Sequence, residues 1–338
     1  MTPFQSLAWI KHWQEIVGRP LILVKPQLVH VYNSEKTVAI LPLGIQEIWG
    51  IKILQWLGGV NTDYMGPLIH PDFNYNLKSE DLWQTIKSRL PKYDVIHFQK
   101  QPDWVVEFFK KIGLSYEFKQ DLKAYKTELP SEWDTLYGSK SAKTRQTDRR
   151  KYRQLEKEDK VEFVVGESED YKRDIIYSMF NHKRRRYRET GVWDMLAIEE
   201  YRKFYEGLAT LSSNKLKIHC SALNVGNVKA ATHVGFIEGS TFYYLMPAYV
   251  GGQFKKYSPS HILLMELMQW SIANGLKFFD FTIGDDAYKK IWCNVESSLH
   301  KILKTNSLKG WIYITFIKMK SLLKKSSFMR RLVRTLRF

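Results

Sequence analysis

The chain of 338 residues is 44% hydrophobic and 26% charged, an ordinary globular composition with enough length for two cores. Its formal net charge of +17 favours anionic partners such as phosphorylated cofactors, acidic glycans, nucleic acid or an anionic membrane face. The two cysteines, Cys220 and Cys293, support neither a disulfide framework nor a zinc site. No signal peptide or membrane-spanning run is recognisable, so we expect a cytoplasmic protein without a bound metal.

The first 125 residues alternate between helical and strand patterns. Apolar runs predict strands at 20–25, 38–43, 54–59 and 95–98. Apolar residues at helical spacing predict helices near the N-terminus, around Trp9, and at 81–90 and 102–113. This alternation predicts a mixed α/β layer structure.

Two basic clusters follow. Residues 139–155 read as a helix, and seven Lys/Arg but only one acid, Asp148, lie between Lys140 and Arg153. The second cluster, at 181–191, contains Arg184 and Arg185, whose guanidinium groups suit carboxylates or phosphates. Each cluster can bind an anionic substrate or lie in water, and nucleic acid is a further partner for the first.

The stretch from residue 215 to 292 carries the most specific pattern. Three strands joined by tight turns, at 215–224, 229–238 and 241–249, predict an antiparallel meander. A polar loop, a helix from Ser260 to Asn274 and a strand at 276–283 follow. The basic loop and the helix N-terminus predict a cradle for a pyrophosphate, because free backbone N–H groups and the positive end of the helix dipole meet there. A plain strand–turn–helix unit with a solvated loop is the alternative.

Two motifs in this stretch resemble a known family. Ser258-Pro259-Ser260 opens the helix, and Asp280-Phe281 leads into Gly284-Asp-Asp-Ala-Tyr-Lys-Lys-Ile-Trp292. This pattern resembles the acyl-CoA-binding half of the GNAT acyltransferase superfamily, in the CelD-like subgroup, which is named after a cellulose-biosynthesis protein. Ser260 stands where that family tends to have glycine. In the first half, Phe4-Gln-Ser with Trp9, Ile40-Leu-Pro-Leu43, and Leu57-Gly58 with Asp63-Tyr64 extend the resemblance to about Leu303.

The resemblance implies an α/β (α+β) fold of two tandem GNAT-like domains, with mixed, mostly antiparallel sheets flanked by helices. The domains expected are a degenerate N-terminal one at 1–125, an acyl-CoA-binding one at 126–303 and a basic tail at 304–338. The implied activity is transfer from acetyl-CoA or another acyl-CoA to an amine or hydroxyl of a cell-surface polysaccharide or lipid-linked sugar precursor. Two alternatives are a FemAB-like transferase that uses aminoacyl-tRNA and a non-catalytic scaffold that binds membrane or polyanion. We do not expect nucleic acid as a partner outside the tRNA alternative.

Acyl transfer of this kind needs a base and a hydrogen-bond donor for the oxyanion. The catalytic candidates are Asp280, Asp285, His233 and Tyr288. A histidine within a strand is also common as a core residue, and Tyr288 can equally be buried. The expected donor-binding residues are Tyr249, Gln253, Lys255, Lys256, Ser258 and Ser260, with the backbone of 244–249 holding the pantetheine arm. The expected acceptor-binding residues are Lys289, Arg184 and Arg185.

The C-terminal tail is strongly basic. No acidic residue follows Glu296, while the span from Lys301 to Arg337 carries eleven Lys/Arg. Two apolar groups fall at helical spacing: Ile312, Phe316, Met319 and Leu323, and then Met329, Leu332, Val333 and Leu336. A basic amphipathic helix of this kind fits an anionic membrane surface, which would place the enzyme peripherally at the inner face. A helix packed on the protein's own body and a disordered basic end are the alternatives.

Overall fold

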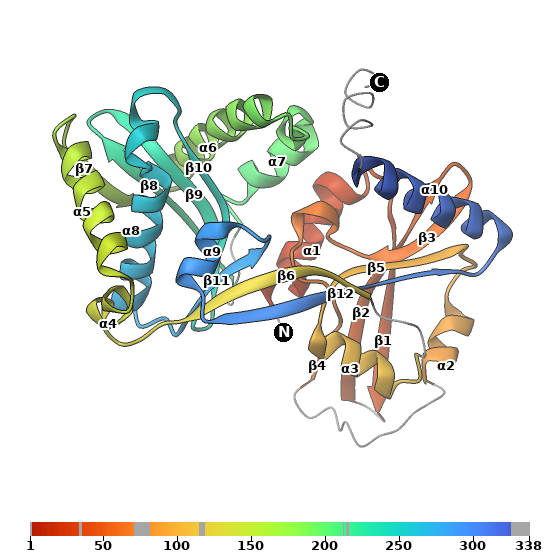
Figure 1. The fold of residues 1–338 in the computed structure, drawn as a ribbon. Helices are drawn as coiled ribbons and strands as arrows, with labels where there is room; N and C mark the ends of the chain where they lie inside the picture. The colour runs from red at the N-terminus through yellow and green to blue at the C-terminus, as the bar shows by residue number, and fades with distance from the viewer. Residues whose placement is uncertain are drawn as a thin grey trace. The chain divides into compact units, whose positions relative to one another are not determined.

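The computed structural model describes residues 2–33, 36–70, 82–114, 119–211, 213 and 216–325. The chain divides into two compact units, one built from residues 22–121 and from 299 onward, the other from residues 2–21 and 122–298 (Figure 1). The chain therefore passes between the units three times, near residues 21, 121 and 298.

The first unit is a sheet covered by helices. Its strands are β1 (Lys25–Asn33), β2 (Lys36–Ile48), β3 (Ile51–Trp56), β4 (Leu68–Ile69), β5 (Val95–Pro102) and the end of β12 (Val295–Thr305). β3 and β5 are parallel, whereas the pairs β1–β2, β2–β3, β2–β4 and β5–β12 are antiparallel. Its helices are α2 (Leu82–Arg89), α3 (Asp103–Lys111) and α10 (Leu308–Lys325).

Strand alternation gives this sheet two apolar faces. Leu54 lies in a large core with Trp83 of α2 and Phe109 of α3. The neighbouring Ile53 contacts Ile314 of α10 instead. Because successive side chains of a strand point to opposite faces, α10 covers the face opposite α2 and α3.

The second unit holds a six-stranded sheet in the order β6-β11-β10-β9-β8-β7. The strands are β6 (Lys119–Glu128), β7 (Val161–Val165), β8 (Lys217–Val225), β9 (Val228–Glu238), β10 (Thr241–Tyr249) and β11 (Phe278–Ile283). The predicted meander is confirmed as β8–β9–β10, and only the β10–β11 pair within this sheet is parallel.

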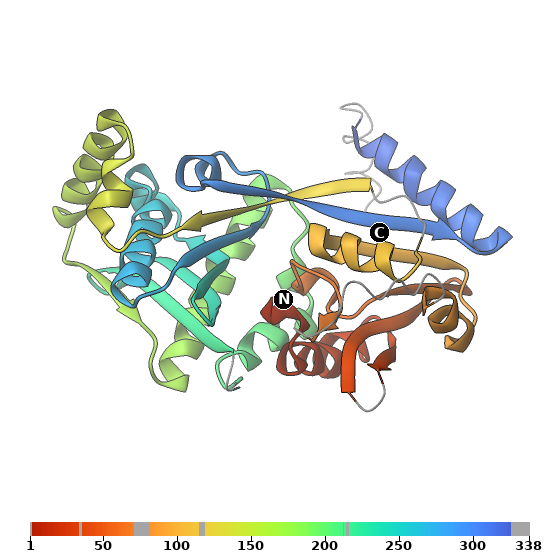
Figure 2. The same ribbon diagram turned by 90° about the horizontal axis from the view of Figure 1, so that it is seen from below.

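Helices cover both faces of this sheet. They are α1 (Leu7–Trp13), α4 (Trp133–Gly138), α5 (Ala142–Glu156), α6 (Glu169–Thr190), α7 (Glu199–Gly207), α8 (Pro259–Ala273) and α9 (Ala287–Trp292). Figures 1 and 2 show α6 and α8 on opposite faces of β9 and β10. Five apolar residues of α8 are buried against Phe242 and Phe279: Ile262, Leu263, Leu264, Leu267 and Met268. The predicted α/β class, with mixed sheets flanked by helices, is confirmed.

Short helical turns complete the chain. They are 3-10 turns at Pro3–Gln5, Gly59–Asn61, Met195–Ala197 and Gly252–Tyr257, and a π-helical turn at Gln14–Gly18. Within the described ranges, no helix has the length and apolarity needed to cross a membrane.

One sequence-based expectation needs correction. The strand predicted at 20–25 is wrong, because β1 begins only at Lys25 and the preceding residues form turns after the first helix. The second basic cluster is the C-terminal part of α6, which continues to Thr190 and ends where Gly191 adopts a left-handed conformation with φ of 65°. The predicted tail helix is confirmed as α10 up to Lys325. Its second apolar group, from Met329 to Leu336, lies outside the described residues.

Candidate functional site

The strands β10 and β11 begin as neighbours and then separate. They pair in parallel from Thr241 opposite Phe278 to Tyr243 opposite Asp280. Beyond that point the register of β10 against β9 shifts between Tyr243 and Met246, and β11 shifts against β6 between Asp280 and Ile283. Irregularities of this kind bend a strand and increase its local twist. The carboxyl end of β10 is therefore directed away from β11.

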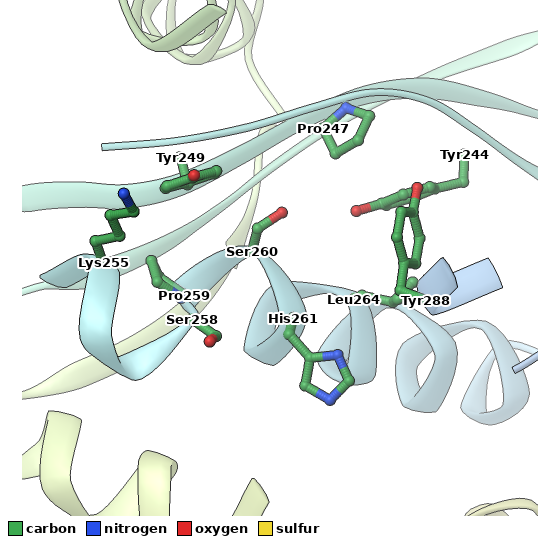
Figure 3. A pocket seen from close by; sticks show the side chains of 10 residues that line it. All are labelled: Tyr244, Pro247, Tyr249, Lys255, Ser258, Pro259, Ser260, His261, Leu264 and Tyr288. Atoms are coloured by element: carbon green, nitrogen blue, oxygen red, sulfur yellow. The ribbon is translucent and has the colours of Figure 1, made fainter. Parts of the chain in front are cut away.

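A cavity of about 380 Å³ lies where the two strands diverge (Figure 3). Its wall is formed by β10, the loop that follows it, the first two turns of α8 and one residue of α9. The lining residues are Tyr244, Pro247, Tyr249, Lys255, Ser258, Pro259, Ser260, His261, Leu264 and Tyr288. These described lining residues include several hydroxyl groups and one lysine but no carboxylate.

One end of the cavity, here called the inner end, carries the hydroxyl groups of Tyr244, Ser260 and Tyr288. In Figure 3, Tyr288 rises from α9 toward Tyr244, and the Tyr244 hydroxyl points toward Ser260. Burial, together with the neighbouring Tyr244, raises the pKa of Tyr288 far above its usual range. Burial also raises the pKa of Tyr244, an effect that the Ser260 hydroxyl partly offsets. Both phenols therefore stay protonated at neutral pH, where they can donate hydrogen bonds but cannot act as bases.

The other end of the cavity, here called the outer end, lies at the start of α8 and is positively charged. Ser258 has a left-handed backbone, with φ of 57°, and it turns the chain so that Pro259 starts α8. The Lys151 ammonium group of α5 donates a hydrogen bond to the Ser258 hydroxyl over 2.7 Å, and Lys255 lines the cavity beside it. The positive end of the α8 dipole adds to these two charges. Together these charges make this end of the cavity, here called the anion-binding subsite, chemically suited to an anion.

A second contact ties α5 to the start of α8. His261 points away from the other lining side chains in Figure 3, and its Nε2 lies 3.0 Å from the Asp148 carboxylate. Asp148 is buried on α5. The basic helix thus brings Lys151 to the Ser258 hydroxyl at the start of α8, outside the lining residues of the cavity. The sequence signalled this contact only through its run of positive charges.

Two predicted donor-binding residues lie apart from the cavity wall. Lys256 lies 3.6 Å from the Glu158 carboxylate and above the ring of Tyr257. Gln253 is exposed in the 3-10 turn. The structure therefore brings Tyr249, Lys255, Ser258 and Ser260 together from the predicted donor-binding set.

The predicted carboxylate bases lie outside the lining residues. Asp280 is buried, and one of its oxygens accepts a hydrogen bond from the backbone N–H of Thr282 over 2.7 Å. Asp285 accepts hydrogen bonds from the Tyr125 hydroxyl and the Lys290 ammonium group, at 2.6 and 2.8 Å. The contacts with Lys290 and Tyr125 lower the pKa of Asp285, which makes it a weaker base.

His233 has a structural position. It stacks on Tyr244 with ring centroids 4.6 Å apart, and its Nε2 accepts a hydrogen bond from the backbone N–H of Leu245. Burial holds the pKa of His233 well below its usual range. The neutral ring supports the irregular segment of β10 behind the cavity. Of the four catalytic candidates, only Tyr288 lines the cavity.

The predicted acceptor-binding residues make contacts with the protein itself. Lys289 is buried and donates hydrogen bonds to the backbone carbonyls of Phe281 and Ile283. Arg185 donates to the carbonyl of Tyr249 over 2.8 Å. Arg184 lies 3.0 Å from the Asp194 carboxylate. Lys289 and Arg185 thereby fix the ends of the two diverging strands.

Lys183 is a residue that the sequence did not single out. It lies on α6, and the charges of Asp286 and Lys289 both act on it. Burial lowers the pKa of Lys183 to about 8. A lysine on the face opposite α8 is thus partly neutral near physiological pH. Its position follows from tertiary packing, since 103 residues separate it from Asp286.

Part of the chain matches a known family, and its fold resembles solved structures. Residues 142–290 match the family model described as acetyltransferase (GNAT) domain. No curated protein sequence matches the chain. The crystal structure of FemX is similar with a TM-score of 0.62 at 11% identity, covering 88% of this chain and 91% of FemX.

Two further solved structures are similar. The C-terminal domain of a proposed lysylphosphatidylglycerol synthetase from Agrobacterium fabrum has a TM-score of 0.55 at 12% identity, covering 90% of this chain and 94% of that domain. A conserved protein of unknown function from Bacteroides thetaiotaomicron has a TM-score of 0.53 at 10% identity, with 88% and 90% coverage. At these identities the likeness concerns the fold. Residues 142–290, which include all the lining residues of the cavity, match the GNAT acetyltransferase domain, within a chain whose fold resembles that of FemX.

Proposed function

We propose that this chain is a CelD-like acyltransferase of the GNAT superfamily. It transfers an acyl group from acetyl-CoA or another acyl-CoA to an amine or hydroxyl of a cell-surface polysaccharide or lipid-linked sugar precursor. The observation that carries the proposal is the cavity at the divergence of β10 and β11, with protonated phenols at one end and a positively charged helix N-terminus at the other. Acyl-CoA matches both ends, because its thioester carbonyl can accept hydrogen bonds from the phenols and its pyrophosphate can bind the positive charge.

The donor follows the length of the cavity. Its pyrophosphate binds at the start of α8, where Lys255, Lys151 and the helix dipole supply positive charge. Its pantetheine arm lies along the diverging end of β10, where the amides of the arm pair with the backbone as an added strand would. The thioester carbonyl then reaches Tyr244 and Tyr288.

The chemistry is attack of the acceptor on the thioester carbonyl carbon. Tyr288 donates a hydrogen bond to the carbonyl oxygen, on which negative charge develops during the attack. The carbon–sulfur bond then breaks, and CoA leaves as its thiolate. Lys183 does not line the cavity, but the charges of Asp286 and Lys289, which lie on either side of Tyr288 in the sequence, act on it. In its neutral form it takes the proton that the acceptor loses. The acceptor approaches from the α6 side of the sheet, since the donor and α8 occupy the other side.

With Lys183 as the base, the rate of acyl transfer depends on pH. A Lys183→Met enzyme is expected to lose about 10²- to 10⁴-fold in kcat, the usual contribution of a positioned base. In the wild type, kcat should rise through pH 8 as the ammonium group loses its proton, and the variant should lack this rise. The matched control is Arg188→Met, an exposed cation on the same helix. An unchanged pH profile in Lys183→Met would remove Lys183 from the mechanism.

The donor class is tested by thermal unfolding of the purified chain with CoA, acetyl-CoA and longer acyl-CoAs. A ligand at about a hundredfold excess over its Kd stabilises the folded state by about 2.7 kcal/mol, which raises Tm by several degrees. An acyl-CoA should give this rise. No rise with any thioester would contradict the proposal and favour the non-catalytic scaffold.

The second candidate is a transferase that uses aminoacyl-tRNA. The similarity of fold to FemX supports it, as does the net charge of +17. Binding of tRNA should fall steeply with salt, because many phosphate contacts release counterions, whereas CoA in the cavity should be less sensitive. Titrating both ligands at low and high salt separates the two candidates.

We also propose that the protein lies in the cytoplasm. Both cysteines are free thiols, which suits the cytoplasm. The basic C-terminal region would hold the enzyme peripherally at the inner membrane face, close to a lipid-linked acceptor.

A further inference from the structure

The helix α10 has apolar side chains on two faces. Its inner face packs on the sheet through Ile314, next to Ile53 and Val95. Its outer face carries five large apolar residues that are between 47% and 77% exposed: Leu308, Trp311, Ile312, Phe316 and Met319. These positions recur at intervals of three and four residues, so they form one stripe along the helix. An exposed stripe of this size marks an interaction surface.

The tip of the β2–β3 hairpin extends the stripe. Trp49 is 81% exposed, and its ring centroid lies 6.0 Å from that of Phe316. Trp49 and Gly50 have φ angles of 52° and 72°, the left-handed pair that a tight hairpin turn requires. Asparagine, aspartate or glycine would adopt the first position at lower cost, so the turn holds a tryptophan in solvent against local preference.

A basic cavity lies beside this apolar surface. It has a volume of about 670 Å³ and is lined by Gly50, Lys52, Lys87, Ser88, Leu90, Pro91, Lys92, Tyr93, Asp94, Asn306, Ser307 and Lys309. Four of these residues are lysines and one is an acid. The carboxylate of Asp94 already accepts hydrogen bonds from the backbone N–H of Lys52 and the hydroxyl of Ser307. The excess positive charge therefore suits an anionic ligand.

The stripe and the basic cavity are continuous. Gly50 lines the cavity directly after Trp49, and Lys309 lines it directly after Leu308. Aromatic and aliphatic side chains thus border a cluster of ammonium groups, which is the arrangement of a protein that rests on a charged bilayer. Figure 1 shows α10 beside β3, with the hairpin of β2 and β3 in the same unit.

We propose that the outer face of α10 and Trp49 dock into the surface of a bilayer that contains anionic phospholipid, and that the basic cavity receives a phosphate-bearing headgroup. Charge favours this occupant over a second copy of the chain. Two copies docked through this face would bring eight cavity lysines together against only two cavity carboxylates, those of Asp94, and no acidic residue follows Glu296 to offset the excess. The inference rests on the proposed location at a membrane, but not on the proposed donor.

The test uses the full chain and vesicles of phosphatidylcholine, alone or mixed with phosphatidylglycerol. The wild type should co-sediment with the mixed vesicles and show a blue shift of tryptophan fluorescence. A Trp49→Ser/Phe316→Ser variant should bind them at least about tenfold more weakly, because two large apolar contacts are lost. A Lys52→Gln/Lys87→Gln/Lys92→Gln variant should lose about fivefold for each charge. Leu28→Ser removes an equally exposed apolar residue elsewhere in the unit and should have no effect.

Two outcomes would overturn the inference. One is equal binding of the wild type and the Trp49→Ser/Phe316→Ser variant to the mixed vesicles. The other is a dimer in solution, measured by light scattering, that this variant dissociates, since the face would then bind a second copy. All variants should keep the Tm rise with acetyl-CoA, so a failed donor proposal is recognised separately from a failed docking surface.

Discussion

A Tyr288→Phe enzyme is expected to bind acetyl-CoA as tightly as the wild type and to lose about 10²- to 10³-fold in kcat. The hydroxyl that is removed lies at the inner end of the cavity, where burial keeps it protonated. Its hydrogen bond strengthens as charge develops on the thioester, so its loss affects the transition state more than the bound donor. Steady-state kinetics together with calorimetric titration of acetyl-CoA separates the two effects.

Tyr125→Phe is the matched control for this prediction. Tyr125 donates its hydroxyl to Asp285, outside the lining residues of the cavity. Its replacement should change kcat by less than about threefold, as expected for a partly exposed hydrogen bond. If Tyr288→Phe retained full activity while Tyr125→Phe or Asp285→Asn lost it, the reaction would take place near Asp285 instead.

The second large effect concerns the anion-binding subsite. A Lys255→Ala/Lys151→Ala variant should bind acetyl-CoA about 10²-fold more weakly. Each charge-assisted hydrogen bond to a phosphate contributes about 1.5 kcal/mol or more, which is roughly tenfold in affinity. Calorimetric titration measures the loss. Acetyl-pantetheine lacks the pyrophosphate, so it should bind more weakly than acetyl-CoA. Its affinity should be the same for the wild type and the variant.

Lys256→Ala is the control for this second prediction. Lys256 is adjacent in sequence but lies over the ring of Tyr257 and beside Glu158. Its replacement should alter the affinity for acetyl-CoA by less than about threefold, as for an exposed ion pair. Equal losses in both variants would mean that the subsite depends on general charge in the loop and not on the positions of Lys255 and Lys151.

Local sequence signals predicted the elements around the site well. Period-two alternation and tight turns placed β8, β9 and β10, and the apolar spacing after Pro259 placed α8. Tyr249, Lys255, Ser258 and Ser260 were expected at the donor site because they lie within one short stretch of chain. A strand, a loop and a helix N-terminus meet through local geometry, without help from the rest of the fold.

Contacts between distant segments could not be predicted in this way. The N-terminal residues 2–21 belong to the second unit, where Trp9 packs against Phe204 with ring centroids 5.1 Å apart. Nothing in the pattern around Trp9 indicates that partner. Lys151 reaches Ser258, and Lys183 comes under the charges of Asp286 and Lys289, in the same manner, from helices that are far away in the sequence.

The candidate bases show a second limit of prediction from the sequence alone. Asp280, Asp285 and His233 have the residue types that a base requires, but their partners were not visible in the sequence. Thr282 occupies one oxygen of Asp280, Tyr125 reaches Asp285 across 160 positions, and the backbone of Leu245 binds His233. A side chain that already supports the backbone or a neighbour is less available for proton transfer.

We expect acyl-CoA to bind where β10 and β11 diverge. Hydrogen–deuterium exchange of the full chain, with and without saturating acetyl-CoA, tests this directly. Exchange should slow in the backbone from Tyr244 to Tyr249 and in the first turn of α8, because the pantetheine and the pyrophosphate cover these N–H groups. Binding of acetyl-CoA that left both segments unchanged and protected another part of the chain would contradict it.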